Sequence, residues 1–133
     1  MAFLIGTVLA LAIGLFATVV GLDRDRAFYP TVMIVIALLY SLFAVLGGST
    51  HVLVLEALAG AVFVALAVWG FKSSLWIVAA ALAAHGIFDL VHGEAIANPG
   101  VPVWWPPFCL AYDVTAACYL AWLLRRGRTR VAG

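Results

Sequence analysis

Long apolar runs separated by short polar connections dominate the chain. Each run comes close to or exceeds the roughly 17–20 residues that a helix needs to cross the hydrocarbon core of a bilayer. The runs cover about residues 2–20, 30–46, 51–71, 75–92 and 105–124. This pattern predicts five transmembrane helices, and the short connections favour antiparallel neighbours in one all-α bundle. Residues 1–133 are therefore predicted to form a single polytopic transmembrane domain.

The basic residues provide a test of the number of spans. With five spans, all seven fall on one side of the membrane: Arg24, Arg26, Lys72, Arg125, Arg126, Arg128 and Arg130. The positive-inside rule makes that side cytoplasmic. The predicted topology therefore has the N-terminus outside and the C-terminus in the cytoplasm, and four or six spans would lose this agreement.

Composition places the chain in the class of integral membrane proteins. Hydrophobic residues make up 67% of it and charged residues only 10%. A soluble domain of 133 residues could not bury that much apolar surface. We expect a multi-pass protein of the inner (plasma) membrane, with the lipid bilayer as its main partner. The net charge of +1 gives no indication of a nucleic-acid partner, and none is expected.

The fourth apolar run carries ionisable side chains at membrane depth. His85, Asp89 and His92 have the spacing i, i+4 and i+7, which places them on one face of a helix. A charge at that depth costs about 2.5–3.5 kcal/mol on insertion scales, so ionisable residues in a span indicate function by default. This stripe is the first candidate for a functional site.

Two other runs bring ionisable residues to the same depth. In the five-span topology, His51, Glu56 and Asp113 all lie in the outer half of the bundle, whereas the inner half of the spans has no acidic residue or histidine. A shared cavity that opens outward explains this placement economically. Cys109 and Cys118 are too far apart on one helix to form a disulfide, and we interpret both as small buried residues.

Imidazole and carboxylate together are the ligands that zinc, iron, manganese and copper bind in proteins. His85 and His92 lie two turns apart, roughly 10 Å along a helix axis, so one ion cannot bind both. Either can combine with a carboxylate such as Asp89 or Asp113. The candidate metal ligands are His85, Asp89, His92 and His51, and the candidate catalytic residues are Glu56, as the general base, and Asp113.

Three functions fit this polar layer. The leading hypothesis is a metal-dependent membrane enzyme that acts on a lipid or a small amphiphile. The second is a small transporter, channel or proton-relay subunit, which needs polar groups that continue to the cytoplasmic side, or a homo-oligomer that completes the pore. The third is an accessory subunit in which the polar layer only fixes the packing of the helices.

Two connections add further expectations. Residues 22–30 form a turn of alternating charge, whose side chains are expected to pair with one another or with lipid headgroups. Residues 98–107 contain four prolines, and they are expected to lie over the polar layer as a lid or as an interfacial cap.

Three segments carry a resemblance that spans most of the chain: GLDRDRAFYP, HGIFDLVHGE and VWWPPFCLAYD. With them, the chain resembles a group of small uncharacterised bacterial integral membrane proteins. The resemblance implies a membrane location and a bacterial source, and it implies no activity.

Overall fold

The computed structural model describes residues 1–129, and this part of the chain contains helices and no strand. The helices are α1 (Ala2–Val20), η1 (Leu22–Arg24), α2 (Phe28–Leu46), α3 (Thr50–Lys72), α4 (Leu75–Ala95) and α5 (Trp105–Arg125). All five α-helices are long and apolar enough to cross a membrane, which confirms the predicted five-span fold class. The helix boundaries differ from the predicted spans by at most three residues.

Local sequence explains where several helices begin and end. The hydroxyls of Ser49 and Ser74 accept hydrogen bonds from the backbone N–H groups of Val52 and Trp76, which caps the N-termini of α3 and α4. α1 ends at Gly21, whose φ of 92° lies in the left-handed region that glycine adopts without strain. These signals separate apolar runs that would otherwise have no sharp boundary.

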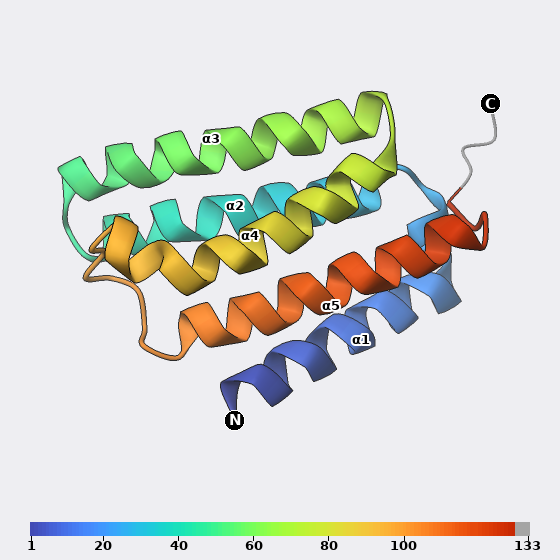
Figure 1. Cartoon of the computed structure of the whole chain (residues 1–133), viewed down its shortest axis with the longest axis horizontal. Helices are drawn as coiled ribbons and strands as arrows, with labels where there is room; N and C mark the ends of the chain where they lie inside the picture. Colours follow the sequence, from blue (N-terminus) through green and yellow to red (C-terminus); the bar gives the residue numbers. More distant parts are fainter. Residues whose placement is uncertain (130–133) are drawn as a thin grey trace.

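Consecutive helices run antiparallel, whereas α1 and α5 run parallel, in a bundle with α4 at its centre (Figure 1). α4 packs against α5, α3 and α2, whereas α1 packs against α5 at the edge of the bundle. We call the end where residues 96–104 join α4 to α5 the loop end, and the end where η1 and residues 73–74 lie the turn end. The N-terminus lies at the loop end (Figure 1).

Small residues let α1 approach α5 closely. Gly6, Ala10 and Gly14 form a buried stripe on α1 with small-xxx-small spacing. A Cβ atom on Gly6 would collide with the backbone carbonyl of Phe108, and one on Gly14 would press on the ring of Tyr119. The outer faces of the helices instead carry large apolar side chains, such as Leu58, Val62 and Trp69 of α3, which suits contact with lipid.

The turn end gathers the basic residues of the described chain, as predicted, while Arg130 lies outside the described residues. The charged side chains of residues 22–30 were expected to pair with one another or with lipid headgroups. Two of them instead contact other parts of the chain. Asp23 is buried and accepts a hydrogen bond of 2.5 Å from Thr18, whose hydroxyl also lies 2.8 Å from the hydroxyl of Tyr119. The Arg26 guanidinium donates to backbone carbonyls near the C-terminus of α3.

Candidate metal centre

The polar stripe on α4 faces the interior of the bundle. His85, Asp89 and His92 are only 1%, 3% and 2% exposed, so the predicted shared face is confirmed. Gly86 lies beside this stripe, and its missing side chain leaves room for α5, because a Cβ there would come within 3.3 Å of the Cβ of Asp113. Close approach of α4 and α5 therefore brings Asp113 to the stripe.

Four buried side chains from α4 and α5 form one cluster, which we call the four-residue group: His85, Asp89, Cys109 and Asp113. His85 Nδ1 lies 2.7 Å from Asp113 Oδ2 and 3.8 Å from Asp89 Oδ2. The Cys109 thiol lies 3.7 Å from the same Asp113 oxygen. One nitrogen, oxygen or sulfur atom from each residue lies within 4.8 Å of the others, which is a spacing suited to a metal ion.

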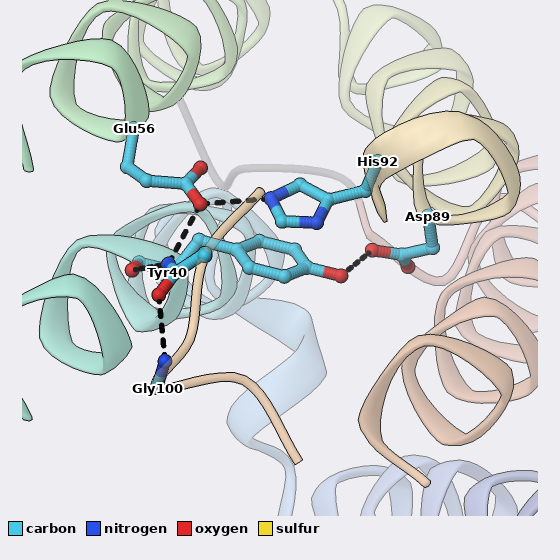
Figure 2. Close-up of polar contacts among 6 residues, drawn as sticks. Tyr40, Glu56, Asp89, His92 and Gly100 are labelled. Carbon is cyan, nitrogen blue, oxygen red and sulfur yellow. Dashed lines mark hydrogen bonds and ion pairs between the residues drawn. The ribbon is translucent and has the colours of Figure 1, made fainter. Parts of the chain in front are cut away.

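A second polar contact joins α3 to α4 at the loop end. His92 Nε2 lies 2.8 Å from Glu56 Oε1, and both side chains are buried. The Asn98 amide donates to the same Glu56 oxygen at 2.8 Å and to the backbone carbonyl of Tyr40 at 3.1 Å. Figure 2 shows the Glu56 carboxylate and the His92 imidazole facing each other beside the Tyr40 ring. We call this contact the His92–Glu56 pair.

Tyr40 of α2 connects the two clusters. Its hydroxyl donates a hydrogen bond of 2.6 Å to Asp89 Oδ1, and its ring stacks on His92 with the ring centroids 3.8 Å apart. Figure 2 shows Asp89 at the hydroxyl end of Tyr40, with His92 and Glu56 nearer its backbone. The stacked ring fixes the plane of the imidazole, so the His92–Glu56 pair and the four-residue group are held in one arrangement.

The loop of residues 96–104 covers the His92–Glu56 pair. Besides the Asn98 contacts, the backbone N–H of Gly100 donates to Asn98 Oδ1 at 3.1 Å (Figure 2). Gly100 lies so close to α2 that a Cβ atom on it would collide with the carbonyl of Phe43. A cavity of about 540 Å³ lies between this loop and His92. The loop therefore occupies the position expected of a lid.

Buried carboxylate oxygens remain without a hydrogen-bond partner in residues 1–129. They are Asp23 Oδ1 at the turn end, and Glu56 Oε2, Asp89 Oδ2 and Asp113 Oδ1 in the two clusters. A buried acceptor with no partner is costly, and such groups call for a ligand, an ion or a proton. Because two of the four belong to the four-residue group, a cation bound there would offset the cost of keeping its carboxylates charged.

The four-residue group has the chemistry of a transition-metal site. Zinc binds thiolate, imidazole and carboxylate at about 2.0–2.3 Å in a tetrahedron, which puts the ligand atoms about 3.3–3.8 Å apart. The 2.7 Å contact between His85 and Asp113 would lengthen by about 0.6 Å, and the widest separation of 4.8 Å would shorten by about 1 Å. Small side-chain movements therefore suffice to enclose an ion.

The structure sorts the predicted site residues into two clusters. His85, Asp89 and Asp113 are in the four-residue group, whereas His92 contacts Glu56 in the second cluster. His51 is exposed in the first turn of α3 and takes part in neither. Cys109 is 2% exposed, as predicted, but Cys118 is exposed, so the prediction that both are buried is wrong for Cys118.

Two members of the site were not predicted as functional. Cys109 lies one turn before Asp113 on α5, so the i, i+4 spacing that defined the stripe on α4 also pointed to it. Asn98 lies in the loop, where no periodicity marks it. Compared with protein families, curated proteins and solved structures, the chain matches none of them. Its function must therefore be argued from the chemistry of the site.

Proposed function

We propose that this protein is a metal-dependent membrane enzyme that acts on a lipid or a small amphiphile. The observation that carries the proposal is the four-residue group, in which four buried potential ligands from two helices converge within 4.8 Å. The unpartnered oxygens of Asp89 and Asp113 support a cation there, because both face the cost of burial without a donor. His85, Asp89, Cys109 and Asp113 would be the metal ligands.

The donor set narrows the choice of metal. A thiol beside an imidazole favours zinc or iron(II) over manganese, because sulfur is a poor ligand for harder ions. Copper shares the preference for nitrogen and sulfur. Bound at this depth, such an ion would polarise a carbonyl or phosphoryl oxygen, or lower the pKa of a bound water.

The His92–Glu56 pair supplies the proton-transfer groups in this proposal. Glu56 Oε1 already accepts from Asn98 and contacts His92, so its role is to orient the imidazole. The second ring nitrogen of His92 is then available to exchange a proton with a substrate group, as in other carboxylate-oriented histidines. His92 replaces Glu56 as the proposed general base, and Glu56 becomes a positioning residue.

The apolar layer of the bundle favours an enzyme over a transporter or proton relay. A second buried polar cluster does exist at the turn end, around Thr18, Asp23 and Tyr119. Between it and the four-residue group lies a layer of side chains with no exposed surface: Met33, Val78, Leu82 and Leu120. A proton or ion would have to cross this layer without a polar partner, which is expensive in a dry interior.

Metal binding is the first test. We expect the purified protein to contain about one zinc or iron ion per chain, and a metal-free sample to gain stability when zinc is added. At a free zinc concentration of 100 times the Kd, the gain in unfolding free energy is about 2.7 kcal/mol. Elemental analysis and thermal unfolding in detergent, followed by circular dichroism, measure the two quantities.

Magnesium is the matched control metal, because it prefers an all-oxygen octahedral site and gains little from a thiol and an imidazole. The proposal requires zinc to stabilise the protein and magnesium at the same concentration to leave it unchanged. The proposal is wrong if the protein holds no metal after gentle purification and its stability does not respond to zinc, iron, manganese or copper. The polar core would then be purely structural.

We further propose that the turn end faces the cytoplasm of a bacterial cell and that the loop end faces outward. The basic residues at the turn end support this orientation. A reporter enzyme that is active only in the cytoplasm, fused after Gly133, is expected to be active. Its counterpart that is active only in the periplasm, fused at the same position, is expected to be silent. The reverse pattern would contradict the orientation.

A further inference from the structure

An apolar groove runs along one side of the bundle, between α1 and α2, and α5 forms part of its wall. Its volume is about 670 Å³, within the range of small-molecule sites. α1 packs on α5 and η1, whereas α2 packs on α3 and α4. The groove therefore lies between α1 and α2. One stripe of α2 lines it: Phe28, Thr31, Val32, Val35, Ile36 and Leu39.

The groove follows the membrane-spanning direction. Its stripe on α2 extends over twelve residues from Phe28 to Leu39, which is about 16 Å along the helix axis. Leu9 and Ile13 of α1 form the opposite wall. These residues belong to membrane-spanning helices, so this part of the groove lies at hydrocarbon depth and offers its ligand mainly apolar contacts. At the turn end the groove is lined by Leu22, Asp25 and Ala27.

One end of the groove reaches the proposed metal site. Cys109 lines the groove and is also a member of the four-residue group, so the two sites share a side chain. Trp105 lines the groove one turn away, and its indole N–H is a buried donor with no partner within the described chain. A ligand with an oxygen atom near Trp105 and a hydrocarbon chain would satisfy both features.

We propose that the groove binds one acyl chain of a membrane lipid, with the polar end near Trp105 and Cys109 and the chain extending along α2 towards Phe28. The assignment of this lipid as the substrate rests on the proposed function, whereas its binding does not. The substrate would then enter sideways from the bilayer, between α1 and α2.

The lining residues favour a lipid chain over a helix from a second copy of the protein. Helices in membranes pack through small residues that let backbones approach. The small faces of this chain are already used internally, Gly6 and Gly14 against α5 and Gly60 against the carbonyl of Ala37 on α2. The groove is instead lined by large, branched or aromatic side chains, which leave a gap suited to a flexible chain.

A photoreactive phosphatidylcholine with a diazirine in the middle of one acyl chain tests the proposal in vesicles of unlabelled phosphatidylcholine. After irradiation, mass spectrometry locates the label. We expect labelling of the groove stripe on α2 about tenfold above that of the outer face of α3, where Leu58 and Val62 contact bulk lipid. A ligand in a defined site should label more than lipid that exchanges freely.

Two matched variants check that the label reports the groove. Val35 lies in the groove and Val62 lies on the outer face of α3, and their side chains are 54% and 58% exposed. Val35→Trp should reduce labelling of the stripe about tenfold by filling the groove, while Val62→Trp should leave it unchanged. The comparison of the two faces in the wild-type protein needs no variant, so a misfolded Val35→Trp protein would still leave a decisive result.

Equal labelling of the groove and the α3 face would overturn the proposal, because it would mean that only freely exchanging bulk lipid contacts the groove. A dimer in mild detergent that Val35→Trp dissociates would overturn it in favour of a second copy in the groove. His85→Gln separates this proposal from the metal site: it should abolish metal binding and leave the labelling pattern intact. A wild-type protein that binds no metal but labels in the groove would count against the enzyme and not against the lipid site.

Discussion

Replacing Glu56 with alanine is expected to lower the free energy of unfolding by about 2–3 kcal/mol. Its Oε1 atom lies 2.8 Å from both His92 Nε2 and the Asn98 amide nitrogen, and Glu56 itself is 1% exposed. Removing the carboxylate leaves the buried His92 nitrogen without its partner, at a cost of about 1–3 kcal/mol, and takes one acceptor from the part-buried Asn98 amide, which keeps its bond to the Tyr40 carbonyl. Single hydrogen bonds between membrane helices contribute only about 0.6 kcal/mol on average. The loss expected for Glu56 is larger because its Oε1 atom contacts two partners.

The measurement is unfolding by sodium dodecyl sulfate in mixed micelles, followed by circular dichroism. Glu56→Gln keeps an acceptor oxygen in nearly the same place and should cost less than half as much as Glu56→Ala. Glu94→Ala is the matched control, since Glu94 is exposed near the end of α4. If Glu56→Ala were no more destabilising than Glu94→Ala, the His92–Glu56 pair would contribute nothing to the packing of α3 on α4.

The sequence was sufficient to predict the helices and the face of α4 that carries the site. Apolar runs of membrane length have few alternatives, because backbone groups in lipid must pair within a helix or a closed barrel. The spacing of His85, Asp89 and His92 then assigns them to one face without any knowledge of neighbours. The membrane depth of the other candidate residues followed from the predicted topology, which placed Glu56 and Asp113 at the level of this stripe.

Which carboxylate contacts which imidazole could not be predicted. That choice depends on the rotation of each helix and on its offset along the axis, and one turn of offset is about 5.4 Å. The observed packing places Asp113 beside His85 and Glu56 beside His92. His51 precedes Glu56 by five residues, about 140° around the helix, so the rotation that buries Glu56 turns His51 away.

The short segments gave the least reliable predictions. Asp23 lies in the three-residue helix η1, where apolar periodicity carries no information, and the structure buries it against Thr18. Asn98 reaches Glu56 only because the loop crosses over α2, where Gly100 lies against Phe43. Such contacts depend on the fold around them, whereas a helix face depends mainly on its own sequence.

Replacing Cys109 with serine is expected to weaken zinc binding by more than about 100-fold, beyond the 10–100-fold that loss of an outer-shell partner costs. Its thiol lies 3.7 Å from Asp113 Oδ2 in the four-residue group and is the only sulfur ligand that this group offers. A serine hydroxyl has similar size, but it does not form the thiolate that zinc binds strongly. Competition with a zinc-binding dye measures the affinity.

Cys118 provides a matched control on the same helix, because it is exposed and outside the four-residue group. Cys118→Ser should keep the wild-type affinity. Cobalt(II) in place of zinc gives a direct readout, since a cobalt–thiolate bond absorbs in the near ultraviolet; the band should be present in the wild type and in Cys118→Ser and absent in Cys109→Ser. Cobalt binding without that band in the wild type would contradict the proposed ligand set, because Cys109 is one of its four members.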